Sequence, residues 1–504
     1  MNNFSLDTPQ RQSPLAIAFI LIKFLRQAAR RFWPLVIFIV FNRGDSYMAY
    51  LFGTLLVISV IQLVLSLISY FNYYFHVKGN ELLIQKGVLQ KTRLNIPFDR
   101  IQTINFNQNI LHQILNVVSV EVDTAGSSKS ELNIDALSRE HAEALRNYIL
   151  QRKEALVKES TDTSGESDGE MAAIPVVRTP DKLVFSMGPI DLMKVGVSQN
   201  HIRTALVLLG SIFGLLQLFD DVKEDSYNYI AEEIVNFQML YGWMWFFAAV
   251  SVLLIAAFVV SMFRTALQYF NLKLWQTEKG FKIIAGLLNR KEQSAAHQKI
   301  QIIRWFTDPL KQIFGLFTVN LYQASSMEVS IRRSISIPGC YEPQLEEIIS
   351  TNFPRALRQN YNEHTISPRI ISRHVLYFGI LPAIAFMIPR MIEADWQGLW
   401  FLLWVPIVWL LSRRFQMRWR WWINEGTLMT RSGIIGTKHT LVHLYKTQAV
   451  KISQSPYQRR YQLASLALYT AAGHISIPYI SLSFARQVRD YVLYKSESDS
   501  RDWM

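Results

Sequence analysis

Long runs of apolar residues alternate along this chain with longer polar stretches. No residue between Ser46 and Phe75 carries a formal charge, and residues 241–263 form a second uncharged run. An α-helix rises about 1.5 Å per residue, so each run can cross the roughly 30 Å of hydrocarbon in a bilayer. Shorter apolar runs lie at residues 32–41, 204–219, 375–389 and 396–412. The pattern predicts a multi-pass α-helical membrane protein whose crossings form three hairpins.

The shorter runs alone leave an alternative open, because buried helices of a large soluble protein are also apolar over such lengths. Residues 32–41 form the shortest run, which spans only with help from flanking residues or along a tilted, partly interfacial path. The membrane assignment therefore rests on the two long uncharged runs. A full crossing by residues 32–41 is an additional assumption.

The polar stretches contain an internal repeat. Residues 82–126 align without gaps to residues 281–325 and to residues 428–472, at constant offsets of 199 and 346 residues. A glycine followed by two aliphatic residues coincides in all three, at Gly87, Gly286 and Gly433. A basic-x-Gln triplet coincides as well, formed by Arg100 and Gln102, by Lys299 and Gln301, and by Lys446 and Gln448. Repetition at fixed offsets indicates three copies of one structural unit.

Each copy is predicted to fold as strands followed by one helix. Apolar residues alternate with other residues in segments such as Val118–Val122 and Phe317–Leu321, which is the period of a half-buried strand. The repeated glycine suits a tight turn that needs a positive φ. Amphipathic helices are predicted at residues 138–151, 343–352 and 481–494. Strands closed by one helix indicate a small barrel or curled sheet with a helix over one end.

These patterns divide the chain into ten segments. In order, they predict an N-terminal amphipathic segment (1–31), transmembrane hairpin 1 (32–75), β-domain 1 (76–152), a flexible acidic linker (153–180), an interfacial segment (181–203), transmembrane hairpin 2 (204–263), β-domain 2 (264–353), a connector (354–373), transmembrane hairpin 3 (374–412) and β-domain 3 (413–496). The linker is rich in Ser, Thr, Gly and acidic residues, a composition typical of chain that buries little apolar surface.

Charge supports a membrane location and predicts its orientation. Charged residues make up 18% of the chain, below the roughly 25% usual for soluble domains. Residues 220–233, between the two apolar runs of the second hairpin, are strongly acidic, whereas arginines cluster before the first hairpin and after the third. Because positive residues favour the cytoplasmic side, all three β-domains are predicted to face the cytoplasm from the cell inner membrane. Cys340 is the only cysteine, so no intrachain disulfide is expected.

Residues 413–422, RRFQMRWRWW, combine arginines with tryptophans directly after an apolar run. Such a stretch can bind nucleic acid or lie at the membrane–water boundary. The aligned positions in the other copies, residues 67–76 and 266–275, are also aromatic-rich exits from a hairpin, so we predict a boundary role and no nucleic-acid partner. The predicted interfacial anchors are Trp275, Trp419, Trp421 and Trp422, with Arg418 and Arg420 as candidates for lipid headgroup contact.

Motifs of catalysis are absent from the sequence. It has no HExxH, P-loop, CxxC or G-x-S-x-G pattern, and we predict no catalytic, cofactor or metal-binding residue. His439 and His443 lie four residues apart, but in a strand they are ordinary polar positions. The triplet residues Arg100, Gln102, Lys299, Gln301, Lys446 and Gln448 support two interpretations. They either stabilise a strand edge, or they face anionic headgroups or a partner protein.

The glycine turn, the triplet, the alternating strands and the closing helix together resemble the bacterial pleckstrin-homology (PH)-like domain family, formerly a domain of unknown function. Three such domains, each behind a transmembrane hairpin, look like the YdbT-type membrane proteins. The resemblance implies three α+β PH-like barrels of about seven strands, each capped by a C-terminal helix. It also implies a partner, a smaller YdbS-type membrane protein with one copy of the domain. Thr447 departs from the Ile of the other triplets, and His76 stands where the other copies have Trp.

The leading functional hypothesis is a non-enzymatic inner-membrane scaffold. Its PH-like domains are expected to mediate protein–protein assembly with a YdbS-type companion or a second copy of the chain, and to contact membrane lipids. Linked modules convert weak contacts into firm ones by raising the effective concentration. Envelope maintenance or resistance to membrane-active agents is the expected context. The alternative is a transporter or lipid-handling protein that uses the space between the hairpins.

Overall fold

The structure of the protein is a computed structural model. It describes residues 8–41, 46–87, 91–124, 132–162, 181–220, 224–324, 334–354, 363–392, 396–424, 426–499 and 501. The chain divides into two compact units. The first unit comprises residues 1–178, 199–272 and 284–293, and the second comprises residues 179–198, 273–283 and 294–504.

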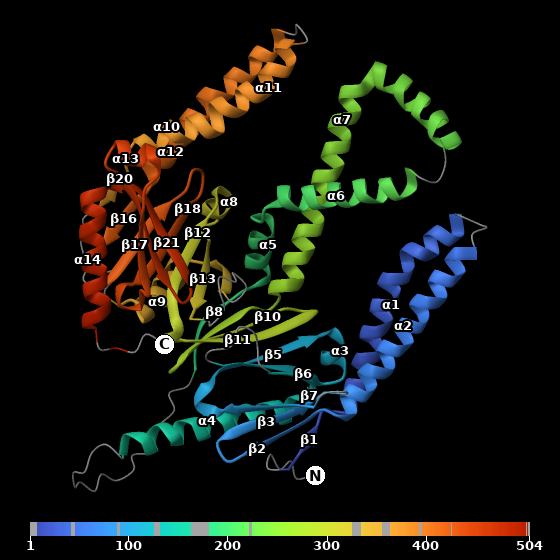
Figure 1. Cartoon of the computed structure of the whole chain (residues 1–504), viewed down its shortest axis with the longest axis vertical. Helices are drawn as coiled ribbons and strands as arrows, with labels where there is room; N and C mark the ends of the chain where they lie inside the picture. Colours follow the sequence, from blue (N-terminus) through green and yellow to red (C-terminus); the bar gives the residue numbers. More distant parts are fainter. Residues whose placement is uncertain are drawn as a thin grey trace. The chain divides into compact units, whose positions relative to one another are not determined.

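Three helical hairpins interrupt the β-rich parts of the chain (Figure 1). The first hairpin is α1 (Ala16–Phe41) and α2 (Ser46–Phe71), and the second is α6 (His201–Asp220) and α7 (Glu224–Tyr269). The third is built from α10 (Arg369–His374), the π-helical turn η4 (Val375–Ile380) and α11 (Leu381–Ile392), followed by the 3₁₀ segment η5 (Trp396–Leu403) and α12 (Trp404–Arg418).

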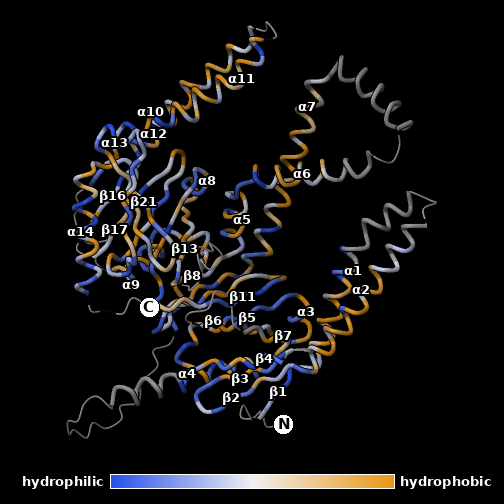
Figure 2. The backbone as a smooth tube through the Cα atoms, viewed as in Figure 1, coloured by the Kyte–Doolittle hydropathy of each residue, from blue (hydrophilic) through white to orange (hydrophobic). Residues whose placement is uncertain are grey.

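Many large apolar side chains of these helices are exposed, and Figure 2 colours long stretches of α7 and α11 as hydrophobic. Among the described residues, four helical segments are long and apolar enough to cross a membrane: Gly53–Phe71, Phe246–Tyr269, Arg369–Ile392 and Trp396–Arg418. Phe247 and Ile255 in α7 are 62% and 63% exposed. Apolar surface on this scale is unfavourable in water and favourable in lipid, so the chain is a membrane protein.

The number of crossings predicted from the sequence depends on two further helices. In α6 the apolar part is shorter, His201–Gly214. Helix α1 includes residues 32–41, whose side chains lie outside the described ones, as do those of the acidic run at residues 220–233. The four segments above are therefore the crossings that length and composition support.

The first copy of the repeat has two antiparallel sheets over a common core. Its strands are β1 (Gln10–Arg11), β2 (Tyr74–Lys78), β3 (Glu81–Lys86), β4 (Thr92–Pro97), β5 (Ile101–Asn109), β6 (Val117–Thr124) and β7 (Leu132–Ser138). The helix α4 (Arg139–Asp162) follows them. Alternate residues of both sheets point inward, so Phe75, Ile84 and Val120 share one buried cluster with Leu145 and Ile149 of α4. Burial of this shared apolar face stabilises the copy.

The second copy repeats this order. Its strands are β8 (Lys182–Ser186), β9 (Lys273–Thr277), β10 (Gly280–Ala285), β11 (Asn289–Ala296), β12 (Ile300–Thr307), β13 (Phe317–Gln323) and β14 (Ser334–Cys340), followed by helix α9 (Glu342–Asn352). A short helix, α5 (Pro189–Val197), lies between β8 and the second hairpin. Cys340 is fully buried.

The third copy completes the series. Its strands are β15 (His364–Thr365), β16 (Arg420–Ile423), β17 (Thr427–Ser432), β18 (Thr437–His443), β19 (Ala449–Ser453), β20 (Leu463–Thr470) and β21 (Gly473–Ser481), followed by α14 (Leu482–Ser498). Helix α14 lies along the strands in Figure 1 and contributes Ala485, Val488 and Val492 to the core.

Backbone details recur at the predicted offsets. A 3₁₀ turn stands between the two sheets in each copy: η1 (Phe98–Arg100), η2 (His297–Lys299) and η6 (Leu444–Lys446). A one-turn helix follows the first strand of each second sheet: α3 (Ile110–Ile114), α8 (Pro309–Ile313) and α13 (Pro456–Arg460). Positive φ angles recur at Asn116, Gly315 and Gln462, and at Gly87, Gly286 and Gly433. Three copies of one fold are therefore present, as the alignment predicted.

One strand per copy was missed by the sequence analysis. In each copy a strand that precedes the hairpin pairs with the first strand after it, as β1 does with β2, β8 with β9, and β15 with β16. These strands fall in the segments expected to be an amphipathic N-terminus, an interfacial segment and a connector. In addition, α4 continues to Asp162, into the expected linker, of which residues 163–180 lie outside the described ones.

The expected closed barrels are not present. The strand pairings give two separate sheets per copy, with orders such as β1-β2-β3-β4 and β19-β20-β21. The prediction of about seven strands and a C-terminal helix agrees with the structure, but the prediction of closure is wrong. In the first two copies the reason is that the first strand of the second sheet pairs outward with a strand of the next copy, as described below.

Candidate interaction surfaces between repeated domains

Strand β5 of the first copy pairs with the start of β11, which belongs to the second copy. The pairing is antiparallel and brings Phe106 opposite Glu292, so that the sheet order within the first unit is β7-β6-β5-β11. Arg146 of α4 reaches across the junction, and its Nη1 lies 2.7 Å from Oε1 of Glu292. The two side chains are only 19% and 11% exposed, so this ion pair is better shielded from water than an ordinary surface pair.

The second and third copies are joined in the same way. Strand β12 pairs with β18 in the antiparallel direction, from Ile302 opposite Val442 to Thr307 opposite Thr437. Trp305 stands opposite His439, and their rings stack with centroids 5.0 Å apart. Applying the sequence offsets to Phe106 and Glu292 gives Trp305 and His439. The two junctions therefore have the same register.

The glycine turns that precede β11 and β18 fit closely against the preceding copy. A Cβ atom added to Gly436 would lie 2.3 Å from the carbonyl oxygen of Thr307, so only glycine allows this approach. At the first junction, Nε2 of Gln113 donates to the carbonyl oxygen of Leu287 at 2.9 Å. Both contacts place the glycine-containing turn of one copy beside the one-turn helix of the copy before it, at Gln113 of α3 and at Thr307 just before α8.

Lys446, the basic residue of the third triplet, is part of this junction. It is 2% exposed, and its Nζ donates to the carbonyl oxygens of Gln298 and Ile300 at 2.5 and 2.9 Å. Burial, together with the positive charge of Arg501, lowers the pKa of Lys446 to about 8. Gln301 of the second triplet is fully buried, and its Oε1 accepts a hydrogen bond from the backbone N–H of Ala472 at 3.0 Å. These two residues bind the preceding or following copy and are not available to lipid headgroups.

The remaining triplet residues are placed differently. Arg100 is exposed at the end of η1, Lys299 is half-buried at the end of η2, and Gln448 is exposed just before β19. Gln102 lies in β5, and its side chain is outside the described ones. The triplet is thus one position in the fold with three environments, and Lys446 and Gln301 support the interpretation that it stabilises a strand edge.

Two histidines complete the junction between the second and third copies. The ring of His443 stacks on Phe353 with centroids 3.8 Å apart, and its Nε2 donates to the carbonyl oxygen of Asn352 at 3.1 Å. Burial, with a smaller contribution from Lys446, lowers the pKa of His443 to about 3. Burial and the charge of Arg431 lower the pKa of His439 to about 4. Both rings are therefore neutral at pH 7 and pack as aromatic surfaces.

The predicted membrane-boundary residues are mostly part of the third copy itself. Trp419 is 5% exposed, and Trp421 is fully buried in the core on β16, so the prediction that they anchor the boundary is wrong. Aromatic residues at the start of a strand look alike in sequence whether they enter a core or a membrane interface. Trp275 and Trp422 are half-buried in β9 and β16.

The arginines of this stretch also have partners within the chain. Arg418 donates from Nη1 to the carbonyl oxygens of Ile434 and Ile435, at 3.1 and 2.9 Å. Arg420 forms an ion pair with Glu363, with Nε 3.1 Å from Oε1. Arg418 therefore fastens the end of α12 to the glycine turn of the third copy, and Arg420 fastens β16 to the segment before the hairpin.

Sequence reasoning missed the residues that carry the junctions: Phe106, Arg146, Glu292, Trp305 and Gly436. The signal available was that β11 and β18 occupy the same place in the repeat as β4, so any partner of one copy is a candidate partner of the next. No group of three or more His, Cys, Asp or Glu side chains suited to a metal ion occurs within the described ranges.

Comparison with known proteins accounts for the repeat. The model of the bacterial PH domain family matches residues 18–153, 211–352 and 376–496. The chain is 22% identical over 474 residues to the UPF0699 transmembrane protein YdbT of Bacillus subtilis, which covers 92% of this chain and 92% of that protein.

A second relative is smaller. The chain is 28% identical over 104 residues to the UPF0699 transmembrane protein YdbS of Bacillus subtilis, which covers 21% of this chain and 65% of that protein. The family matches fall on the three copies described above, each together with a large part of its hairpin.

Proposed function

Because this chain belongs to the bacterial PH domain family, we propose that it is a non-enzymatic, membrane-anchored scaffold whose three PH-like domains assemble with other proteins by strand pairing. The observation that carries the proposal is the repeated junction. Two of the three copies present the first strand of their second sheet to a neighbour, and both do so in the same register. A surface built twice for the same contact is an assembly surface.

The membrane part of the proposal concerns location and orientation. The apolar helices support a membrane location, and the distribution of Arg and acidic residues favours the inner membrane with the PH-like domains in the cytoplasm. The turns that follow Gly286 and Gly433 carry exposed aliphatic residues, Leu287 and Ile435 among them, at 42% and 61% exposure. The N–H of Leu287 donates to the carbonyl oxygen of Leu267 near the end of α7, so these side chains lie at the exit of a hairpin and can contact the lipid surface.

The partner in the proposal is a membrane protein with one PH-like domain, of the YdbS type. Support comes from the similarity of one part of this chain to the smaller relative. Tethering to one bilayer raises the effective concentration of weakly binding domains. Envelope maintenance or resistance to membrane-active agents is the proposed context.

Affinity purification tests this function. The full chain, tagged at one end and extracted in mild detergent, should recover a smaller membrane protein with one PH-like domain, identified by mass spectrometry. A matched control is an unrelated tagged membrane protein of similar abundance. Repeated recovery of this chain without any membrane partner would contradict the scaffold function.

A further inference from the structure

The third copy has an unpaired edge where the other two copies have a neighbour. In the part of the chain that the structure describes, β19 pairs only with β20, and the sheet order is β19-β20-β21. Six of the eight residues in β12 are buried, whereas β19 has none that is fully buried. The equivalent strand is therefore covered in the second copy and open in the third.

The register of a strand added to β19 follows from the two junctions. Phe106 of the first copy and Trp305 of the second are equivalent to Ile452 in the third. A partner strand that pairs with β19 in the same register therefore places its equivalent of Glu292 and His439 opposite Ile452. Exposed lysines often protect strand edges from pairing, and Lys451 lies on this edge. A cation there is compatible with pairing, however, because Arg304 occupies the same place in β12 and donates from Nε to Oγ1 of Thr440 across the junction at 3.3 Å.

The charge beside this edge indicates which partner fits. Arg146 stands eight residues after Ser138, whose hydroxyl caps α4, and Arg489 stands eight residues after Ser481, which caps α14 in the same way. Arg146 has Glu292 of the next copy as its partner. Among the residues that the structure describes, Arg489 forms an ion pair only with the adjacent and exposed Asp490, at 2.8 Å. The third copy thus keeps the arginine of the first junction without the acid that crosses to it.

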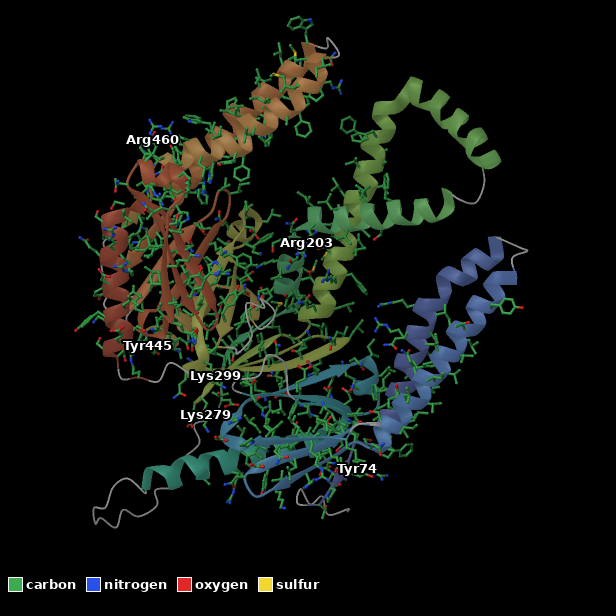
Figure 3. All side chains as sticks on the ribbon, in the orientation of Figure 1. Tyr74, Arg203, Lys279, Lys299, Tyr445 and Arg460 are labelled. Atoms are coloured by element: carbon green, nitrogen blue, oxygen red, sulfur yellow. The ribbon has the colours of Figure 1, made fainter. Side chains whose placement is uncertain are left out.

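A hollow lies at the end of the same edge. It has a volume of about 480 Å³ and is lined by Gln454, Pro456, Arg459 and Arg460. Figure 3 labels Tyr445 and Arg460, which precede and follow β19 in the chain. Gln454 is the equivalent of Thr307, which receives the Gly436 turn, and Arg459 is the equivalent of Gln113, which donates to the turn at Leu287. The hollow is therefore where the glycine turn of a further copy would fit.

We propose that the outer edge of β19 binds the third strand after the hairpin, the equivalent of β11 and β18, of a PH-like domain in a second protein, and that this strand carries an acidic residue opposite Ile452, paired with Arg489. The inference rests on the proposed scaffold function and names its docking surface. Main-chain hydrogen bonds along β19 provide the affinity, and the acidic residue provides the specificity.

A second copy of the same chain does not fit this description. In the described part of the chain, β4 is the equivalent of β11 and β18 that lies at the edge of its sheet. The residue of β4 that is equivalent to Glu292 is Arg93, which is exposed. Pairing β4 with β19 would set Arg93 against Arg489, and like charges at such a contact oppose association.

The predicted need for an acidic residue opposite Ile452 can be tested with variants of this chain alone. Arg93→Glu supplies a third strand with the stated acid, and the full chain carrying it should associate head to tail through β4 and β19. Light scattering in mild detergent should then show dimers and longer oligomers that the wild-type chain does not form, since a heterologous contact propagates. Adding Arg489→Glu should reverse the effect, and Lys78→Glu, an equal charge change on β2, should have none.

Disulfide formation checks the register. Thr92→Cys in the Arg93→Glu chain and Ser453→Cys in a second, differently tagged chain stand opposite each other in the register above, and the native Cys340 is buried. The two chains should cross-link, and the same pair with Arg93 retained should not. If Arg93→Glu stays in the oligomeric state of the wild type, or if the wild type cross-links equally well, the inference is overturned.

The recovery of the companion protein with the tagged chain tests this inference separately from the scaffold function. Arg489→Glu should sharply reduce the amount of single-domain partner recovered with the tagged chain, whereas Lys78→Glu should leave it unchanged. Equal recovery with Arg489→Glu would overturn the inference and leave the scaffold function standing. Recovery of no partner by the wild-type chain would count against the scaffold function itself.

Discussion

At the scale of single residues, the buried side chain of Lys446 joins the third copy to the second. The Nζ of Lys446 donates to two carbonyl oxygens of the second copy, and its hydrogen bond to the carbonyl oxygen of Ile300 is buried. We expect Lys446→Met to lower the free energy of unfolding by about 1–3 kcal/mol, because the buried carbonyl oxygen of Ile300 loses its donor. Thermal unfolding in detergent measures this, with the exposed Lys451→Met as control. Equal, small effects of both variants would contradict the assigned role of Lys446.

Two histidines make the same junction sensitive to acid. The folded-state pKa values of His439 and His443, about 4 and about 3, lie below the value of about 6.5 expected in the unfolded chain. Between these limits the unfolded chain binds more protons than the folded chain, so the free energy of unfolding decreases as the pH falls. At pH 5 the loss is about 2 kcal/mol per histidine.

Melting temperatures at about pH 7.5 and about pH 5 test this expectation. The double variant His439→Gln, His443→Gln should lose less stability on acidification than the wild type, because the groups that titrate in the unfolded chain are gone. His443→Gln retains a donor for the carbonyl of Asn352. If the double variant has the same acid sensitivity as the wild type, the two rings are not buried in the neutral form.

At the scale of elements, a glycine sets how closely two strands can approach. We expect Gly436→Ala to disturb the pairing of β12 with β18, because its Cβ would lie 2.3 Å from the carbonyl oxygen of Thr307. A destabilisation of about 1–3 kcal/mol is typical of such overpacking. Hydrogen exchange of the β18 amides should accelerate. Gly426→Ala, where a Cβ meets nothing within 4 Å, is the control, and slow exchange in Gly436→Ala would contradict the close contact.

The strands also show which parts of the fold the sequence could predict. Alternation in Val118–Val122 and the offsets of 199 and 346 residues predicted strands and three copies, because these signals are local or repeated. The partner of β12 could not be predicted, since residues 437–443 would look the same paired within their own copy or with the preceding one. Strands β1 and β15 have two residues each, too few to show any period.

Site residues were harder to predict for a related reason. Composition and the aligned aromatic positions of the other copies placed Trp421 at a membrane boundary, yet its ring is fully buried. The triplet was recognised as a shared feature, but its role at Lys446 depends on two carbonyl groups more than 140 residues away. Tertiary environment, which the sequence does not display, decided both cases.

At the scale of the whole molecule, the alternation of hairpins and PH-like domains predicts that all three domains lie on the same side of the membrane. Single cysteines at Lys78, Lys279 and Lys451, one per copy, should react with a membrane-impermeant maleimide only after the cells are opened. The native Cys340 is buried and should give little background. Labelling of any one of the three positions in intact cells would show that its domain lies outside the cytoplasm.

The central claim is that consecutive PH-like domains are joined strand to strand in one shared register, and disulfide cross-linking in native membranes tests it most directly. Asn107→Cys with Lys291→Cys, and Phe306→Cys with Lys438→Cys, stand opposite each other at the two junctions. Both pairs should form disulfides in high yield. The pairs shifted by one residue, Asn107→Cys with Arg290→Cys and Phe306→Cys with Thr437→Cys, should not, because their side chains point to opposite faces. Cross-linking at neither junction, or equal yields for aligned and shifted pairs, would contradict the account.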